Sequence, residues 1–335
     1  MVWRQIMLAL PTVESVPSYL VDRVGRLARG LQAELELFHC FYDPHLVQGR
    51  GREQDLNALI AGRVEASKRR VERVADTLRD QHVEVRVTVR FDYPIFEAVI
   101  RQVLRKGPNL LLVPAVSAAP GDRGALSYTD ARLIETCPCP LLLMKTEKVY
   151  SNNPIVAAVD PMHARAKPAE LDDSIVAAAK TLSAALGDAP VQVYHAIPPL
   201  LGRVAREGDG ETTEAPAPVE QHKAYFGEGQ AEVRKLAARY EIPDSLTHVE
   251  AGAVESSLPV FVRESRANAV VMGAVSRSYP ARALFGYTAE RVLPALDCDV
   301  LIVKPKDFRC PVSRRPRPLP GRPAAGRRAP AVHAS

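Results

Sequence analysis

The sequence predicts an α/β protein made of two tandem domains, each a five-stranded parallel sheet with helices on both faces. The chain has 335 residues, more than the roughly 250 that one hydrophobic core usually serves. Short apolar runs alternate with amphipathic segments of helix length, which is the pattern of a parallel sheet covered by helices. The order of these segments in the second half repeats the order in the first.

The first half contains five strand-like runs and four segments of helix length. The segment Gly51–Gln81 illustrates the helical pattern, because Leu56, Ile60, Val64 and Val71 recur on one face at three-to-four spacing or its multiple. The strands are expected at Gln5–Leu10, Ala33–Phe41, Val83–Val89, Asn109–Val113 and Pro140–Met144. The helices are expected at Val13–Leu31, Gly51–Gln81, Ile95–Arg105 and Thr129–Glu135.

The second half repeats this series of elements. Its one long polar stretch, Gly202–Pro218, is rich in turn-forming residues and is expected to form a mobile loop. The strands are expected at Pro154–Val159, Val191–Ala196, Thr247–Glu250, Ala269–Met272 and Asp299–Val303. The helices are expected near Glu170–Leu186, Glu220–Tyr240, Ser256–Glu264 and Ala289–Ala295.

The repeat can be followed residue by residue. A shift of 159 positions aligns Asn109–Lys145 with Asn268–Lys304 without a gap, and 11 of these 37 positions are identical. The identical positions of the first half are Asn109, Ala115, Val116, Ser117, Arg123, Tyr128, Thr129, Arg132, Cys139, Leu142 and Lys145. Chance pairing would give only a few identities. We therefore expect two homologous domains, at 1–147 and 153–306.

The basic excess of the chain lies at its C-terminus. The net charge is +5, but Lys306 and seven later arginines face Asp307 alone, so the rest of the chain is slightly acidic. The segment 307–335 is rich in Pro, Gly and Arg and is expected to be disordered, because it cannot bury enough apolar surface to offset its ordering entropy. Such a tail can contact nucleic acid or other acidic surfaces, although a solvated extension without a fixed partner is the favoured interpretation.

The sequence carries no sign of a membrane or secretory protein. No apolar run reaches the roughly 20 residues of a transmembrane helix, and the first residues lack a cleavage site for a signal peptide. The five cysteines are an odd number, which argues against a disulfide framework and for a reducing compartment. We therefore expect a cytoplasmic protein without a membrane partner.

The segment Met272–Pro305 contains a strand, a glycine-bearing loop, a helix and a closing strand. It resembles the C-terminal signature of universal stress protein domains, and YTDARLIETCPCPLLLMK in the first half fits the same signature. The resemblance is to the tandem, two-domain members of that family and covers about residues 3–306. It implies two Rossmann-like (adenine nucleotide alpha hydrolase-like) domains and a role in the stress response.

Many members of this family bind ATP through a pattern of Gly, two residues, Gly, nine residues, Gly, then Ser or Thr. Glycines let backbone amides approach the phosphates, and the helix that follows favours negative charge at its N-terminus. In the second domain these positions are Gly273, Ser276, Gly286 and Tyr287, with Thr288 one place later. The spacing is intact, but Ser276 and Tyr287 depart from the pattern, which puts nucleotide binding in doubt.

Two further residues complete the candidate nucleotide site of the second domain. Asp160 closes the first strand and matches the acidic residue with which the family contacts the nucleoside, although it also suits an ordinary strand-end turn. Met272 stands directly before the loop. The resemblance therefore implies that any ATP bound here would meet Asp160, Met272 and the loop.

The first domain departs further from the family pattern. Pro114 replaces the first glycine, Ser117 the second and Ser127 the third, and Pro11 stands where Asp160 stands in the second domain. Proline removes a backbone donor, and loss of the acid removes the nucleoside contact. We expect no ATP binding in this half.

Cysteines and histidines form no catalytic or metal pattern. Cys137 and Cys139 have one residue between them, which is the wrong spacing for a thioredoxin motif, and no further cluster completes a zinc site. Cys139 repeats as Cys298, which favours a packing role. His39 and His195 end the two second strands and either line the cleft or, the favoured interpretation, serve the fold.

These features predict a non-catalytic cytosolic stress-response module that binds and signals, with no catalytic residue, no metal and no required cofactor. The first alternative is a regulatory switch that binds ATP in the second domain and hydrolyses it slowly. The second is a cleft that takes another small or apolar ligand. For assembly, Pro140–Met144 and Asp299–Val303 are expected to pair within the chain as a pseudo-dimer, with a homodimer as the alternative.

Overall fold

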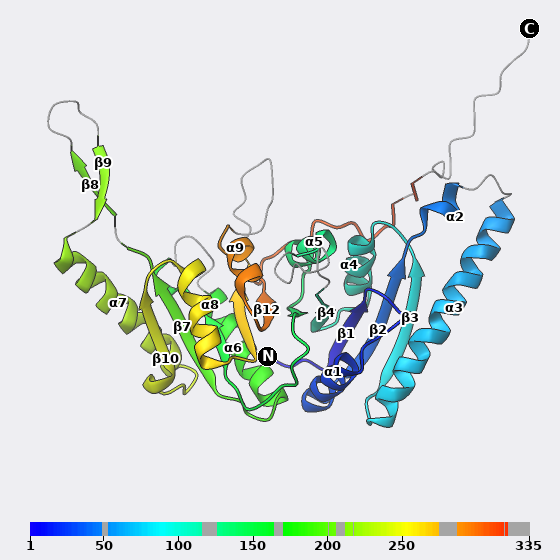
Figure 1. The fold of residues 1–335 in the computed structure, drawn as a ribbon, viewed down its shortest axis with the longest axis horizontal. Coiled ribbons are helices and arrows are strands. Elements are labelled where there is room, and N and C mark those ends of the chain that lie inside the picture. Colours follow the sequence, from blue (N-terminus) through cyan, green and yellow to red (C-terminus); the bar gives the residue numbers. More distant parts are fainter. Residues whose placement is uncertain are drawn as a thin grey trace, which may run out of the picture.

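The computed structural model contains one continuous sheet of ten strands, with helices on both of its faces (Figure 1). The strand order is β10-β7-β6-β11-β12-β5-β4-β1-β2-β3. The structure describes residues 1–48, 53–115, 126–163, 170–199, 201–205, 212–216, 218–274, 287–317 and 319–320. The α/β class is therefore as predicted, and the two five-stranded sheets join into one through the last strands of the two halves, which the sequence predicted to pair.

The first half supplies the strand order 3-2-1-4-5, with all neighbours parallel. Its strands are β1 (Gln5–Leu10), β2 (Glu34–Phe41), β3 (Val85–Phe91), β4 (Leu110–Pro114) and β5 (Leu141–Met144). Its helices are α1 (Ser18–Leu31), α2 (Pro44–Gln48), α3 (Glu53–Asp80), α4 (Ile95–Lys106) and α5 (Tyr128–Thr136). The helix α1 begins later than expected, because Pro17 stands at its N-cap with extended backbone angles.

The second half repeats this order with β10, β7, β6, β11 and β12. Its strands are β6 (Ile155–Ala158), β7 (Val191–Ile197), β10 (Thr247–Ala251), β11 (Ala269–Gly273) and β12 (Asp299–Val303). Its helices are α6 (Glu170–Ala185), α7 (Val219–Ala238), α8 (Val254–Ser265) and α9 (Tyr287–Ala295), with short 3-10 turns η1 (Pro161–His163) and η2 (Asp244–Leu246).

The sequence predicted a loop for the polar stretch before α7, but the structure places two short strands there. The strands β8 (Leu201–Ala205) and β9 (Thr212–Pro216) pair antiparallel and form a separate two-stranded ribbon. It projects away from the sheet in Figure 1. Each strand of this ribbon pairs only along its inner edge, and its outer backbone groups have no partner strand among the described residues.

Alternation along the strands divides the core into two layers. In β1, Ile6 and Leu8 belong to the layer covered by α1, α3, α6 and α7, whereas Met7 and Ala9 belong to the layer covered by α4, α5, α8 and α9. Each layer contains residues of both halves. The two halves therefore share one continuous core on each face of the sheet.

The last strands of the two halves join the sheet at its centre. Strand β5 pairs antiparallel with β12, with Leu143 opposite Val300 and Leu141 opposite Ile302. On one face the helices α1 and α6 also meet closely, since a Cβ on Gly30 would lie 2.0 Å from the carbonyl oxygen of Ala185. Glycine is required at this contact because any side chain would collide with backbone.

Two repeated lysines cross this junction in opposite directions. Lys145 Nζ donates to the carbonyl oxygens of Leu293 and, at 2.7 Å, Leu296 at the end of α9. Lys304 Nζ lies 3.3 Å from the carbonyl oxygen of Glu135 near the end of α5. A cation at a helix C-terminus satisfies carbonyls that have no partner within the helix. The identity of these two lysines in the repeat therefore reflects reciprocal contacts between the halves.

A buried ion pair fixes the two halves against the linker between them. Arg23 of α1 pairs with Asp299, the first residue of β12, and their side chains are 2% and 0% exposed. Tyr150 Oη donates to Asp299 Oδ2 at 2.6 Å, and the backbone N–H of Lys145 donates to Oδ1 at 3.0 Å. The guanidinium of Arg23 also lies 4.3 Å from the ring centroid of Tyr150. The backbone N–H of Thr146 also donates to Oδ1, at 3.3 Å. Four groups from the first half and the linker thus converge on one carboxylate of the second half.

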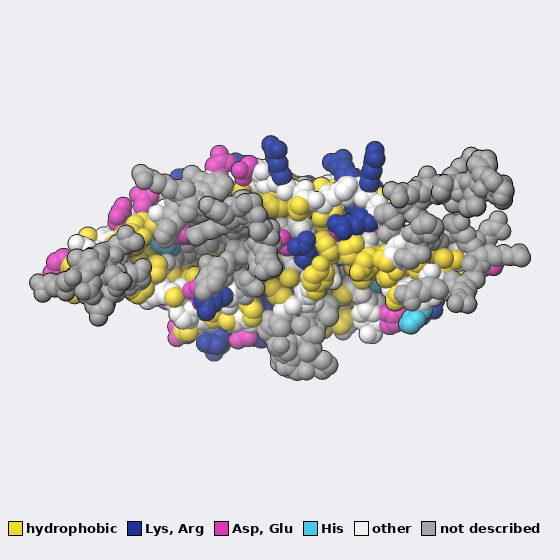
Figure 2. All heavy atoms as spheres, turned by 90° about the horizontal axis from the view of Figure 1, so that it is seen from above, with side chains coloured by type: hydrophobic (Ala, Val, Ile, Leu, Met, Phe, Trp, Pro, Cys, Tyr) yellow, Lys and Arg dark blue, Asp and Glu magenta, His cyan; other side chains and the backbone are white. Residues whose placement is uncertain are grey.

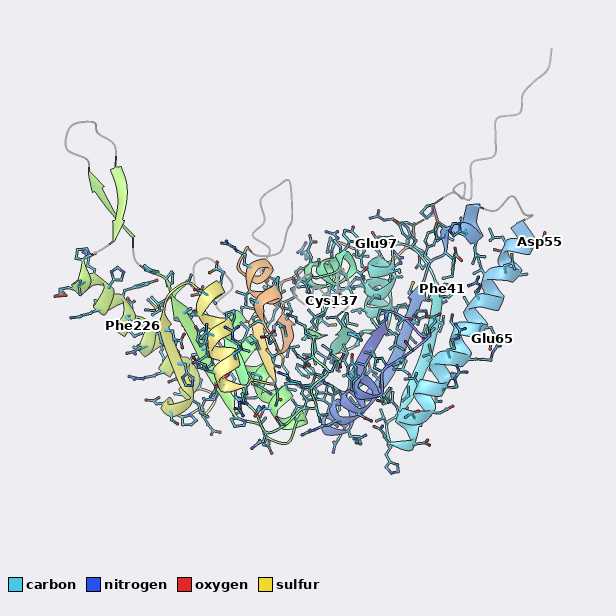
Figure 3. The ribbon with its side chains drawn as sticks, in the orientation of Figure 1. Phe41, Asp55, Glu65, Glu97, Cys137 and Phe226 are labelled. Atoms are coloured by element: carbon cyan, nitrogen blue, oxygen red, sulfur yellow. The ribbon has the colours of Figure 1, made fainter. Side chains whose placement is uncertain are left out.

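The C-terminal residues that the structure describes lie along the first half (Figure 1). Cys310 and Val312 pack against the core layer that α4 and α5 cover. Arg317 Nη2 lies 2.7 Å from Glu97 Oε1, at the start of α4 (Figure 3). The first part of the segment that the sequence predicts to be disordered, 307–317, therefore contacts the first half through a few anchoring side chains. Residues 321–335 lie outside the described residues.

The view from above shows how the surface charge is distributed (Figure 2). Hydrophobic and basic side chains lie side by side over the middle and the right of this face, while acidic side chains gather toward the left end, on the second half. No helix among the described residues is long and apolar enough to span a membrane.

We predict that Asp299→Asn lowers the free energy of unfolding by about 3–5 kcal/mol, because Arg23 would remain buried without its charge partner. Urea unfolding of the full chain measures the change. Asp307→Asn, at an exposed position nearby, is the control and should change stability by less than about 0.5 kcal/mol. The double variant Arg23→Met/Asp299→Met should lose less than the two single variants together. A loss below about 1 kcal/mol for Asp299→Asn would contradict the assigned role.

Candidate functional site

The candidate site of the second half lies at the carboxyl ends of β6 and β11. Strand β6 pairs in parallel with β7 on one side and with β11 on the other, so the chain adds strands in one direction from β6 to β10 and in the opposite direction from β11 onward. Ligands of such sheets bind at this switch point, beyond the carboxyl ends of the strands. Ala158 pairs with Met272, which brings Asp160 and Gly273 to the same edge. The sequence had placed both residues in one site.

Asp160 is held at this edge by α6. Its backbone N–H donates to Asp172 Oδ1 at 3.0 Å, and Asp172 is 5% exposed. The side chain of Asp160 is 45% exposed, and its Oδ1 lies 4.0 Å from Nδ1 of His195. Asp172 was not singled out from the sequence, although acidic residues in a first helical turn are a known signal of helix starts. The arrangement leaves the Asp160 carboxylate at the rim, beside a buried imidazole.

His195 and its counterpart His39 serve the ends of the first strands. His195 Nδ1 lies 3.0 Å from the carbonyl oxygen of Val159, and His39 Nδ1 lies 2.9 Å from that of Leu10. A carbonyl oxygen only accepts, so each ring donates from Nδ1. Burial lowers the pKa of His39, which favours its neutral form. Both histidines are 4% exposed or less, which fits the structural interpretation favoured from the sequence.

Gly273 has a packing reason to be glycine. A Cβ at this position would lie 2.7 Å from Leu171 Cδ2 and 3.4 Å from Ile175 Cδ1. The first turns of α6 therefore press against the end of β11. The sequence had assigned Gly273 to close phosphate approach, but its missing side chain also makes room for a helix.

The rest of the predicted loop is only partly described. Met272 is 6% exposed and belongs to the core layer under α8 and α9. The backbone of Tyr287 and Thr288 forms the first turn of α9. Ser276 and Gly286 lie outside the described residues. Of the predicted site residues, the structure thus brings Asp160, Met272 and Gly273 together at one edge.

The corresponding edge of the first half is occupied by other chemistry. Ser127 is the N-cap of α5, and its Oγ accepts a hydrogen bond from the N–H of Asp130 at 3.1 Å. This capping bond uses one of the N–H groups that a phosphate would need. Pro11 and Pro114 lack a backbone N–H, and Ser117 lies outside the described residues.

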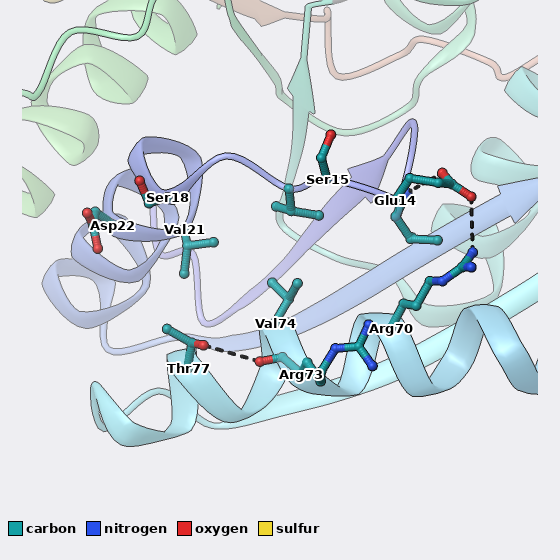
Figure 4. A pocket seen from close by; sticks show the side chains of 11 residues that line it. Glu14, Ser15, Ser18, Val21, Asp22, Arg70, Arg73, Val74 and Thr77 are labelled. Atoms are coloured by element: carbon teal, nitrogen blue, oxygen red, sulfur yellow. Dashed lines mark hydrogen bonds and ion pairs between the residues drawn. The ribbon is translucent and has the colours of Figure 1, made fainter.

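A cavity of about 390 Å³ opens beside this edge, between the β1–α1 loop, α1 and α3 (Figure 4). Glu14 faces it and accepts a hydrogen bond from Arg70 at 3.1 Å. The Thr12 hydroxyl lowers the pKa of Glu14. Because Glu14 already pairs with Arg70, the cavity presents balanced charge. It is lined by Val13, Glu14, Ser15, Val16, Ser18, Val21, Asp22, Arg70, Arg73, Val74 and Thr77.

The cysteines are placed for packing. Cys298 is 3% exposed, and burial raises the pKa of its thiol to about 12. Cys137 Sγ lies 3.6 Å from Cys139 Sγ, and all five cysteines are free thiols. Among the described residues, no group of three or more His, Cys, Asp or Glu side chains is arranged to hold a metal ion.

Solved structures share this fold. A functionally unknown protein from Pseudomonas aeruginosa PAO1 matches 91% of this chain and 94% of its own, with a TM-score of 0.69 and 22% identity. A universal stress protein from Archaeoglobus fulgidus matches 89% of this chain and 98% of its own, with a TM-score of 0.63 and 14% identity. At these identities the likeness concerns the fold alone.

Sequence comparisons point to one family. Residues 153–304 match the family model described as "Universal stress protein family". The chain is 27% identical over 233 residues to universal stress protein E of Photorhabdus laumondii, covering 69% of this chain and 72% of that protein. It is 26% identical over 232 residues to universal stress protein E of Escherichia coli K12, covering 69% and 71%.

We predict that Gly273→Ala destabilises the protein by about 1–3 kcal/mol, because the new methyl group overlaps Leu171. Gly62→Ala is the matched control, since nothing lies within 4 Å of a Cβ there. It lies inside α3 and should stabilise by about 0.5–1 kcal/mol. Urea unfolding with a circular dichroism readout measures both changes. Equal effects of the two substitutions would rule out the packing role of Gly273.

Proposed function

Because the chain belongs to the universal stress protein family, we propose that it is a cytosolic, non-catalytic stress-response protein that binds and signals. In this proposal the first half is a scaffold, and the ligand cleft lies in the second half around Asp160 and Gly273. No cofactor is required, and nucleotide binding in the second half is vestigial.

The difference between the two strand edges supports this proposal. The second half presents a 45% exposed carboxylate at the switch point, where the first half has Pro11. The N-terminus of α5 is capped by Ser127, whereas the matching position in the second half is Gly286, which has no side-chain acceptor. Among the described residues, the exposed acid at the end of the first strand is therefore a feature of the second half, and Ser127 already occupies one helix N–H group in the first.

A second candidate function is an ATP-regulated switch with slow hydrolysis in the same cleft. It is favoured by the spacing of Gly273, Gly286 and Thr288 and by the place of Asp160 on the rim. Against it stand Ser276 and Tyr287, which depart from the family pattern. The two functions differ in how tightly ATP binds and in whether it turns over.

Calorimetric titration of the full chain with ATP, with and without magnesium, separates the two functions. The vestigial site predicts a Kd weaker than about 1 mM, which corresponds to less than about 4 kcal/mol of binding free energy. The switch predicts a micromolar Kd that Asp160→Asn abolishes. Asp160 is the better probe than Gly273, because substitution of Gly273 would also disturb α6.

Glu14→Gln is the matched control for Asp160→Asn, since Glu14 follows the first strand of the other half. It should leave any nucleotide binding unchanged. A parallel assay measures phosphate release from ATP. Multiple turnovers at about 1 s⁻¹ or faster, lost in Asp160→Asn and kept in Glu14→Gln, would overturn the non-catalytic proposal.

A further inference from the structure

A second cavity lies where the two halves and their linker meet. It measures about 290 Å³ and is lined by Asp22, Arg23, Arg26, Arg29, Gln81, Val149 and Tyr150. Three of these residues are arginines of α1, at successive intervals of three positions. Tyr150 precedes β6 and Gln81 follows α3. The cavity therefore lies toward the amino ends of the strands, away from the edge that carries Asp160.

The hydrogen bonds of Arg26 and Arg29 go to uncharged groups. Arg26 donates to the carbonyl oxygens of Tyr150 and, at 3.0 Å, Leu186. Arg29 Nη1 donates to the amide oxygen Oε1 of Gln81 at 2.8 Å. A guanidinium has five N–H donors, so these bonds leave donors of both residues unused by the described residues. Their positive charge is thus fixed in place by neutral partners.

The third arginine and the nearby acid complete the lining. Arg23 is committed to Asp299, but its buried Nε has no hydrogen-bond partner among the described residues. Asp22 Oδ1 lies 3.4 Å from Nε2 of Gln81. Since Asp299 balances Arg23, one carboxylate, Asp22, remains on the lining beside two guanidinium groups. The lining therefore carries a net positive charge.

The arrangement favours an anion with oxygens in three dimensions. Residues three apart on a helix are displaced around its axis as well as along it. The side chains of Arg26 and Arg29 therefore leave α1 at different heights and different angles. A carboxylate offers two oxygens in one plane, whereas a phosphate offers a tetrahedral set. Arginine binds phosphate through charge-assisted and often paired hydrogen bonds.

We propose that this cavity binds a phosphate group through Arg26 and Arg29. The bound group would accept hydrogen bonds from the two arginines of α1, and Arg26 also donates to the linker carbonyl of Tyr150. It would sit beside the ion pair of Arg23 and Asp299, at the junction of the two halves. The site is separate from the cleft of the proposed function and does not depend on it.

Calorimetric titration of the full chain with inorganic phosphate and with tripolyphosphate tests the site. Binding should weaken roughly ten- to hundredfold in Arg29→Ala, the range expected for lost hydrogen bonds to a charged group. It should also weaken as sodium chloride is raised, because the contact is electrostatic. Arg69→Ala, an exposed arginine of α3, is the control and should bind like the parent chain. Absence of binding at about 10 mM of either anion would overturn the proposal.

Gln81→Glu distinguishes a ligand site from a purely structural arginine cluster. The new carboxylate would stand where Gln81 Oε1 already meets Arg29. It should compete for the guanidinium and abolish phosphate binding. Because it also removes the donor that faces Asp22, the melting temperature of the ligand-free variant is measured alongside to confirm that the protein is folded. Unchanged phosphate affinity in both Gln81→Glu and Arg29→Ala would place the bound anion elsewhere and contradict the assignment.

Two further titrations, with ATP and with adenosine, identify the source of the phosphate group. Binding of inorganic phosphate or tripolyphosphate alone would assign the site to free phosphates. Additional binding of ATP, lost in Arg29→Ala and kept in Asp160→Asn, would assign it to the phosphates of a nucleotide. ATP binding lost only in Asp160→Asn belongs to the cleft of the second half, and this site would then be judged on the inorganic anions alone.

Discussion

The structure depends on the carboxylate of Asp299, which is fully buried at the first residue of the last strand. A charge in such a place is stable only with partners that replace its hydration. Those partners are Arg23 of α1, Tyr150 of the linker, and the backbone N–H groups of Lys145 and Thr146. The last strand of the second half is therefore stabilised by a helix and the linker of the first half.

The need to pair the last strand of each half explains why two repeated domains form one sheet. An isolated copy would leave β5 or β12 as an edge strand with unpaired backbone groups. Their antiparallel pairing covers both edges, and Lys145 and Lys304 each reach the end of a helix in the other half. Position 140, which matches Asp299 in the repeat, is proline. The ion pair between Arg23 and Asp299 thus has no counterpart in the repeat, although the strands and helices around it are repeated.

Local sequence patterns predicted most of the strands and helices, but they could not predict contacts between residues far apart in the sequence. Strand and helix positions follow from periodicity, and the repeated Asn109 and Asn268 follow from alignment; each side chain holds the backbone that enters the first strand of its half. Arg23 and Asp299 are 276 positions apart, so no spacing rule links them. The packing of Cys310 likewise depends on a surface that only the folded first half supplies. Composition alone therefore could not indicate the contacts that residues 307–317 make with the first half.

The same distinction applies to the candidate site. Gly273 fits a phosphate-loop spacing, yet its lack of a side chain also accommodates Leu171, so the residue type alone does not separate binding from packing. Asp160 has no comparable packing demand, because its side chain is 45% exposed. The acid and its exposure, together with Ser127 capping the other half, therefore support the proposed cleft in the second half more firmly than the glycines do.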